Sequence, residues 1–295
     1  MLLTRRHFSL GLGTLLAGAT LVRQPLAAAA ETGPAADLAR IETGISGRLG
    51  VAVHDTGTGR RLEYRSGQRF PMCSTFKVVA SAALLTRVDA GREKLDRRIR
   101  FGAGDLVTYS PVTKDRVGGD GMTLAELCEA GITQSDNTAA NLLLANIGGP
   151  AGMTEYARSL GDAMTRLDRI ETELNESTPG DPRDTTTPAA MTETLRKLVL
   201  GDALSPASRD HLAAWLVANK TGDARLRAGV PKDWRVGDKT GSGDHGTAND
   251  IGVFWPPGRA PLVVSVYLTE TKASMDDRSA AIAAVARVVT GWAKA

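Results

Sequence analysis

Cysteine and histidine are scarce in this chain, which has two cysteines and four histidines among its 295 residues. Cys73 and Cys128 can form at most one disulfide, so a fold held together by several disulfides is excluded. Outside the first thirty residues the histidines are His54, His211 and His245, which are scattered without the spacing of zinc ligands. We therefore expect neither a metal nor a cofactor.

The chain also lacks a large excess of one charge. Its formal net charge of +3 equals the contribution of Arg5, Arg6 and Arg23, all near the N-terminus. The balanced remainder gives no support to binding of nucleic acid or of an anionic membrane surface. The apolar stretch from Phe8 to Val22 falls short of the ~20 residues that a membrane-spanning helix needs. We therefore expect no membrane anchor.

Residues 1–30 have the pattern of an export signal, with a basic start, an apolar stretch and small residues that suit a signal peptidase. The paired arginines followed by His-Phe-Ser-Leu match the twin-arginine pattern, and an ordinary secretory signal is the alternative. We expect the twin-arginine export machinery and signal peptidase as partners in transit, and a soluble periplasmic or secreted protein. A protein that folds before export should not depend on a disulfide for its stability.

Strand signals lie at both ends of the remaining chain. Residues 49–70 alternate apolar and polar side chains around the sequence DTGTG, which predicts a β-hairpin, and WRVGDKTGSG, DIGVFWPPGR and APLVVSVYLTE predict three more strands. We predict one domain (31–295) of α/β (α+β) class. Residues 31–70 and 217–295 would form a five-stranded antiparallel sheet flanked by helices, and residues 71–216 a helical lobe without convincing strands. A cleft between the lobes would hold the site.

The hexapeptide MCSTFK, residues 72–77, offers three possible nucleophiles and one possible base. Ser74 and Lys77 are three residues apart, so on a helix the amine could take the hydroxyl proton. The following residues are apolar on nearly every face, which predicts a buried helix whose N-terminus favours developing negative charge. A serine helix cap with a solvated lysine is the alternative interpretation.

The tripeptide SDN, residues 135–137, follows an apolar segment. In a functional interpretation Ser135 relays a proton to a leaving nitrogen, and Asn137 offers its amide to a substrate carbonyl. The alternative is a helix cap, for which all three residue types are suited.

The tripeptide KTG, residues 239–241, lies inside a strand pattern. Gly241 indicates close approach of a ligand or of another backbone. Lys239 and the hydroxyls of Thr240 and Ser242 would bind a carboxylate, and the backbone N–H groups of Ser242 and Ser74 could form an oxyanion hole. An edge strand with a protective lysine is the alternative.

A long polar segment, RLDRIETELNESTPGDPRDTTTP, begins at residue 166. Glu171 and Asn175 are four residues apart, so one helical turn would aim both side chains at one water molecule. A structured loop needs internal ties, and Arg169 with Asp184 is a candidate ion pair. A solvated loop rich in acids is the alternative.

The motifs S-x-x-K, S-D-N, E-x-E-L-N and K-T-G occur in this order, and the chain thereby resembles the class A serine β-lactamases over essentially its whole mature length. The resemblance implies a monomeric hydrolase of penicillins and cephalosporins that gives resistance to these antibiotics. Ser74 would be acylated, with Lys77 or Glu171 as the base of that step, and Ser135 and Lys239 would assist protonation of the leaving nitrogen. Glu171 would then activate the hydrolytic water.

The resemblance also implies substrate-binding roles and shows departures from the family pattern. Tyr109 resembles the family's aromatic wall, and Arg225 the arginine that some members use for the substrate carboxylate, since Ala248 stands where others have one. Thr172 replaces the proline that often follows the glutamate. The segment KTGSGDHGTANDI is similar to that of the cefotaximase branch, which favours oxyimino-cephalosporin hydrolysis without settling it.

Two further expectations depend on the resemblance. Gly243 and Ser81 occupy the positions where some members have a cysteine that pairs with Cys73 or Cys128, so we expect two unpaired thiols. The rival functions are a DD-peptidase or other penicillin-binding protein, a β-lactam sensor and a non-catalytic protein of the same fold. Glu171 and Asn175 argue against the first, and the absence of a transmembrane segment argues against the second.

Overall fold

The computed structural model describes residues 33–295. The predicted signal peptide, residues 1–30, lies outside the described residues. None of the helices in residues 33–295 combines the length and apolarity that crossing a membrane requires.

A five-stranded antiparallel sheet with the strand order β2-β1-β9-β8-β7 organises this part of the chain. Its strands are β1 (Arg48–Asp55), β2 (Arg61–Tyr64), β7 (Arg235–Gly243), β8 (Thr247–Trp255) and β9 (Leu262–Thr269). The predicted sheet is thus confirmed. Strands β7 and β8 are joined by a tight turn in which His245 and Gly246 both have positive φ, a conformation that suits short hairpins.

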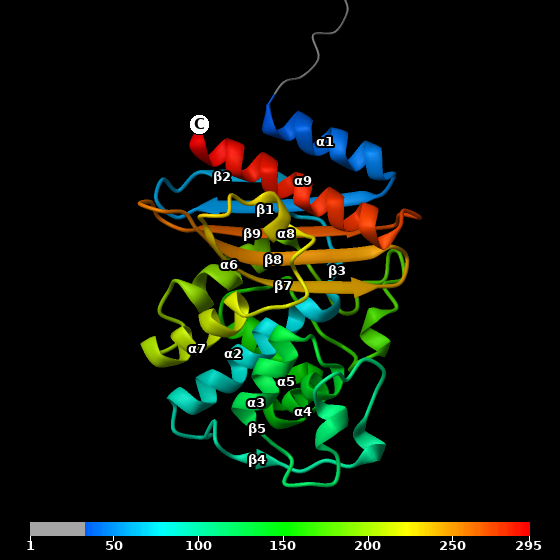
Figure 1. Cartoon of the computed structure of the whole chain (residues 1–295), viewed down its shortest axis with the longest axis vertical. Helices are drawn as coiled ribbons and strands as arrows, with labels where there is room; N and C mark the ends of the chain where they lie inside the picture. Colours follow the sequence, from blue (N-terminus) through cyan, green and yellow to red (C-terminus); the bar gives the residue numbers. More distant parts are fainter. Residues whose placement is uncertain (1–32) are drawn as a thin grey trace, which may run out of the picture. The chain divides into compact units, whose positions relative to one another are not determined.

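Helices α1 (Pro34–Ile45) and α9 (Met275–Lys294) lie on one side of the sheet (Figure 1). They bury an apolar cluster that includes Leu38, Val266 and Val285, none of which has any exposed surface. The short helix α8 (Leu226–Gly229) also contributes to this cluster through Leu226.

The other side of the sheet packs against a second and larger apolar cluster. Helix α2 (Phe76–Asp89) lies within it, and its first ten residues are all buried. This confirms the predicted buried helix, with the difference that a 3₁₀ turn, Cys73–Thr75, precedes it and holds Ser74. The other helices of this region are α3 (Leu124–Thr133), α4 (Asn137–Ile147), α5 (Gly149–Ser159), α6 (Pro188–Val199) and α7 (Pro206–Val217).

Residues 71–216 also contain strands, which the sequence did not indicate. They are β4 (Arg98–Ile99), β5 (Met122–Thr123) and β6 (Thr185–Thr186), and β6 pairs with β3 (Phe70–Pro71). The prediction of no strands in this region is wrong in this detail. Each strand has two residues, which is too short for an alternating pattern to appear in the sequence.

Candidate active site

A cavity of about 320 Å³ lies where the 3₁₀ turn of Ser74 meets the start of α4 and the edge strand β7. Nine of the twelve predicted site residues line it, namely Ser74, Tyr109, Ser135, Asn137, Asn175, Arg225, Thr240, Gly241 and Ser242. The other three, Lys77, Glu171 and Lys239, are buried and contact these residues directly. The structure therefore brings all twelve together.

Strand β7 approaches the nucleophile's turn closely because Gly241 has no side chain. A Cβ at Gly241 would lie 2.7 Å from the carbonyl oxygen of Met72 and 3.3 Å from Cβ of Cys73. Asn249 on β8 fixes the same segment, since its Nδ2 donates to the carbonyl oxygens of Pro71 and Met72 at 2.9 and 3.1 Å. The KTG strand and Ser74 are thus held against each other by backbone packing.

Ser74 is 8% exposed, and its Oγ donates to Glu171 Oε1 at 3.4 Å. Lys77 Nζ donates to the Ser135 carbonyl oxygen at 2.8 Å and to Asn137 Oδ1 at 2.7 Å, and it lies 3.0 Å from Glu171 Oε1. Burial lowers the pKa of Lys77, and the Glu171 carboxylate opposes that shift. Among the hydrogen bonds of residues 33–295, none joins Lys77 Nζ to Ser74 Oγ, so the serine hydroxyl faces Glu171.

Glu171 is held from two sides. Asn175 Nδ2 donates to Glu171 Oε2 at 2.6 Å. The two side chains are thus close together, as the spacing of four suggested, but only Asn175 lies in a 3₁₀ turn, Glu173–Asn175, and no single helical turn holds both. The Asn141 side chain on α4 binds the Glu171 backbone twice. Its Oδ1 accepts from the Glu171 N–H and its Nδ2 donates to the Glu171 carbonyl oxygen, both at 2.9 Å. The peptide bond between Glu171 and Thr172 is cis.

Sequence reasoning missed Asn141 and Thr221. Asn141 stands four residues after Asn137 on the same helix face, which is the signal that could have found it. Thr221 lines the cavity, and its Oγ1 lies 2.6 Å from Thr240 Oγ1, but no motif surrounds it in the sequence.

The SDN tripeptide combines both of its interpretations. Asp136 caps α4 by accepting from the Ala139 N–H at 2.9 Å, and it also binds the N–H groups of Val112 and Thr113. Ser135 has a positive φ of 58° and does not cap the helix. Its Oγ lies 3.0 Å from Lys239 Nζ and 3.5 Å from Lys77 Nζ. The hydroxyl of Ser135 thus stands between two ammonium groups.

Lys239 is fully buried, which excludes the solvated edge lysine considered from the sequence. Its Nζ also donates to the Thr240 carbonyl oxygen at 2.8 Å. Burial, reinforced by the positive charge of Lys77, lowers the pKa of Lys239 to about 7.

Arg225 is only 6% exposed, so it is not a surface ion pair. Its Nη1 donates to the carbonyl oxygens of Gly241 and Asn249 at 2.8 and 2.7 Å, and its Nη2 donates to Ser242 Oγ at 2.7 Å. Because Ser242 Oγ accepts from Arg225, its own hydrogen is free to point elsewhere. Tyr109 is 58% exposed at the rim of the cavity.

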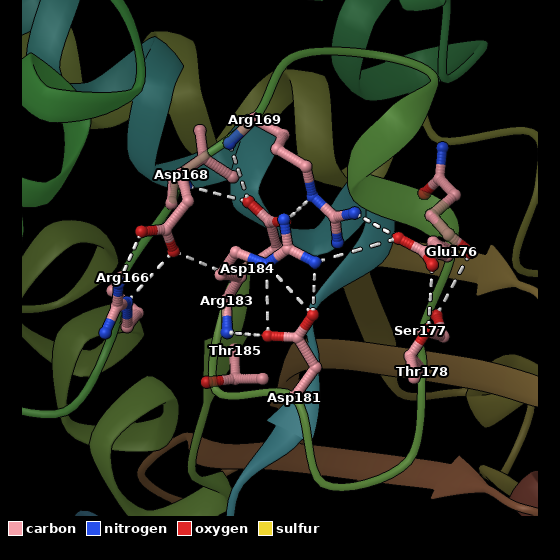
Figure 2. Close-up of polar contacts among 12 residues, drawn as sticks. Arg166, Asp168, Arg169, Glu176, Ser177, Thr178, Asp181, Arg183, Asp184 and Thr185 are labelled. Atoms are coloured by element: carbon pink, nitrogen blue, oxygen red, sulfur yellow. Dashed lines mark hydrogen bonds and ion pairs between the residues drawn. The ribbon is translucent and has the colours of Figure 1, made fainter.

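The segment 166–184, here called the Glu171 loop, is tied internally (Figure 2). Arg169 Nε donates to Asp184 Oδ2 at 2.6 Å, which confirms the predicted ion pair. Asp184 also accepts the N–H groups of Asp168 and Arg169 at 2.8 and 2.9 Å. Asp181 and Arg183 form a second, more exposed pair. The interpretation of this segment as a merely solvated loop is therefore wrong.

Both cysteines are free and buried, as expected from the resemblance. Burial raises the pKa of each thiol to about 12. Since the thiolate is the reactive form, Cys73 is unsuited to catalysis, and Ser74 is the nucleophile candidate of MCSTFK. Residues 33–295 contain no cluster of three or more metal-binding side chains.

The fold and the site together define a serine hydrolase. The model of the β-lactamase enzyme family matches residues 33–293. β-Lactamase AST-1 of Nocardia asteroides is 52% identical over 91% of this chain and 87% of its own length, and β-lactamase CTX-M-8 of Citrobacter amalonaticus is 47% identical over 98% and 96%.

Solved structures of class A β-lactamases are similar as well. An ancestral Gram-negative enzyme superposes with a TM-score of 0.87 at 67% identity over 88% of this chain and 99% of that one. The putative PenP of Rhodopseudomonas palustris also gives 0.87, at 62% identity over the same shares. This chain belongs to the β-lactamase enzyme family, as a class A serine β-lactamase. It is a hydrolase of the β-lactam amide bond, and that activity gives resistance to β-lactam antibiotics.

Proposed function

We propose that this enzyme opens the β-lactam ring of penicillins and cephalosporins through an acyl-enzyme on Ser74 that Glu171 and water then release. One observation carries the proposal: Glu171 Oε1 lies 3.4 Å from Ser74 Oγ and 3.0 Å from Lys77 Nζ, at the wall of a cavity lined by Ser74. The carboxylate is therefore within reach both of the nucleophile's proton and of a water molecule next to the ester.

In acylation, Ser74 Oγ attacks the β-lactam carbonyl carbon while its proton passes to Glu171, directly or through water. The Lys77 ammonium, occupied by three acceptors, favours the negative charge of Glu171 and of the attacking oxygen. The N–H groups of Ser74 and Ser242 stabilise the oxyanion. When the C–N bond breaks, Ser135 Oγ gives its proton to the lactam nitrogen, and the neighbouring ammonium of Lys77 or Lys239 replaces that proton.

Before deacylation, Glu171 returns the proton that it took from Ser74 to the lysine that reprotonated Ser135, by way of Lys77 Nζ at 3.0 Å. Glu171, again a carboxylate, then takes a proton from water as the water attacks the ester carbonyl, and it gives that proton to Ser74 Oγ as the serine leaves. Asn175 orients the carboxylate through the 2.6 Å hydrogen bond to Oε2. Asn141 fixes the backbone of the same residue. Such double support keeps a general base in its working position.

Substrate recognition is divided between the two walls of the cavity. The substrate carboxylate is bound by the hydroxyls of Thr240 and Ser242 and by the charge of Lys239. Arg225 acts through Ser242: because Arg225 donates to Ser242 Oγ, the hydroxyl hydrogen of Ser242 is free to bind the carboxylate. Asn137 gives one amide hydrogen to the Thr108 carbonyl oxygen at 2.8 Å and keeps the other for the substrate's side-chain carbonyl. Tyr109 provides an apolar wall at the rim.

The decisive experiment replaces Glu171 by Gln and follows the reaction by mass spectrometry. Wild-type protein should turn over a chromogenic cephalosporin many times, whereas Glu171→Gln should accumulate a covalent adduct on Ser74 because deacylation lacks its base. Glu173→Gln is the matched control, since Glu173 is an exposed acid of the same loop. A single equivalent of product from the wild type would instead indicate a penicillin-binding protein or sensor.

We propose further that residues 31–295 act outside the cytoplasm as a monomeric single catalytic domain, after export through residues 1–30. The twin arginines Arg5 and Arg6 and the following apolar stretch support this route. Replacing both arginines by lysine should retain the enzyme in the cytoplasmic fraction. Light scattering of the mature protein should give the mass of one chain.

A further inference from the structure

Two carboxyl groups, Asp238 and Asp250, lie together behind the candidate site without any exposed surface. They stand on neighbouring strands, β7 and β8, where Asp238 pairs with Gly252 and Asp250 with Thr240. The two acids are therefore diagonal neighbours on one face of the sheet, which brings their side chains within reach of each other. None of the catalytic steps described above uses either of them.

Both carboxyl groups hold the segment that carries Arg225. Asp250 Oδ2 accepts from the backbone N–H of Leu226 at 3.0 Å. Asp238 Oδ1 accepts from Arg227 Nε at 2.5 Å. The two residues that follow Arg225 are thus each fixed by one member of the pair. Asn249, which precedes Asp250, accepts from Arg225 Nη1 through its carbonyl oxygen.

A shared proton would allow two buried acids to lie side by side. Asp238 Oδ2 accepts from Asn219 Nδ2 at 2.6 Å, but Asp250 Oδ1 is buried and has no donor among the described residues. A proton shared between the acids satisfies that oxygen and removes their repulsion. Burial, together with the charge of Asp238, raises the pKa of Asp250 well above its usual value. The charged groups that act on the pair are Arg225, Arg227 and Lys239.

We propose that Asp238 and Asp250, sharing one proton, form a positioning pair that fixes Arg225 toward the Ser242 hydroxyl and thereby sets the preference for β-lactams that bear a carboxylate. The inference rests on the proposed function in one respect, the binding of the substrate carboxylate at Ser242. The pair acts only through Arg225 and does not touch the substrate.

The test compares a penicillin with its methyl ester, which lacks the negative charge. Asp250→Ala removes the anchor of Leu226, so kcat/KM for the free acid should fall about tenfold, the size of one lost charge-assisted hydrogen bond. For the ester, kcat/KM should change by less than about twofold. Asp250→Asn should restore most of the activity on the acid, because its amide can accept from Leu226 and donate to Asp238.

A double-mutant cycle separates positioning from general destabilisation. Arg225→Ala should also lower kcat/KM for the acid, and adding Asp250→Ala to it should cause no further loss, because both changes remove one interaction. Additive losses, or equal losses on acid and ester, would overturn the inference. If the wild type hydrolyses both but does not prefer the acid, the inference fails while the proposed hydrolysis stands. If it hydrolyses neither, the proposed function itself fails.

Infrared spectroscopy covers the case in which Asp250→Ala does not fold. The wild-type protein at neutral pH should show the C=O band of a protonated carboxyl group that Asp250→Asn lacks. Identical spectra in this region would mean that no proton is shared, and the inference would be wrong.

Discussion

Lys77 and Lys239 are both buried next to the Ser135 hydroxyl, but only Lys77 has a carboxylate partner. Lys77 is paired with Glu171 at 3.0 Å. Lys239 donates to Ser135 Oγ and to a carbonyl oxygen, neither of which carries a full charge. An ammonium group without a counterion loses its proton more readily when it is buried, which accounts for the pKa of about 7 at Lys239. Its charge therefore depends on the pH at which the enzyme works.

Replacement of Lys239 by Arg tests this dependence. Because the pKa of Lys239 is about 7, the side chain is charged below that pH and neutral above it. The value of kcat/KM for a carboxylate substrate should then fall as pH rises through this region. Arginine stays protonated, so Lys239→Arg should move the alkaline limb upward by about one pH unit or more. A pH profile with the methyl ester is the control, and an unshifted limb for the acid would contradict the assignment.

Residues inside the four motifs could be predicted from the sequence because a short spacing along the chain keeps their side chains close together, whether or not one helix holds both. Ser74 with Lys77, and Glu171 with Asn175, are examples. Asn141 and the Asp238–Asp250 pair could not be predicted. Their partners come from other elements, and only the packing of the chain brings these together. Asp238 stands directly before KTG, but nothing in the sequence shows that it is buried beside a second acid.

At the scale of elements, long patterns predicted the structure better than short ones. The strands of the sheet and helix α2 were predicted because apolar residues follow their period over many positions. The two-residue strands β4, β5 and β6 and the 3₁₀ turn of Ser74 were not predicted, because elements of two or three residues are too short to show a repeating apolar pattern. The Glu171 loop has no such pattern, and its Arg169–Asp184 tie was predicted only as one candidate pair. The loop's order depends on such ties.

The Glu171 loop should depend much more on Asp184 than on its exposed ion pair. Asp184 is 1% exposed and accepts three hydrogen bonds from Asp168 and Arg169. Asp184→Asn removes the charge that holds the Arg169 guanidinium and should cost about 2 kcal/mol of unfolding free energy. Deacylation should slow as well, because Glu171 lies in this loop.

Arg183→Ala is the matched control, because the Arg183 side chain is half exposed and its pair with Asp181 lies at the surface. Its cost should be within about 0.5 kcal/mol. Urea unfolding and hydrogen exchange of residues 166–184 measure both variants, and single-turnover kinetics measures deacylation. Equal effects of the two substitutions would show that Asp184 is not the tie that orders the loop.

At the scale of the whole described chain, the sheet separates two apolar clusters, and only one of them adjoins the site. Neither cluster contains any of the twelve predicted site residues. The larger cluster, however, includes α2, which begins two residues after Ser74 and carries Lys77. Strand β7 is one of the two edge strands of the sheet, so no further strand lies between KTG and the cavity. The site is therefore supported more directly by the larger cluster, which includes α2, than by the cluster beneath α1 and α9.

Matched cavity-forming substitutions test that asymmetry. Val285 on α9 and Val79 on α2 are both fully buried, one in each cluster. Replacing either by Ala removes two buried methyl groups, so each variant should lose about 2 kcal/mol of unfolding free energy and about 5 °C in Tm. Only Val79→Ala should also lower kcat/KM, by about threefold or more, because a shift of the first turns of α2 moves Ser74 and Lys77 relative to Glu171. Thermal unfolding and steady-state kinetics at 25 °C measure the two effects, and an equal loss of activity in Val285→Ala would mean that the sheet transmits strain between the clusters rather than separating them.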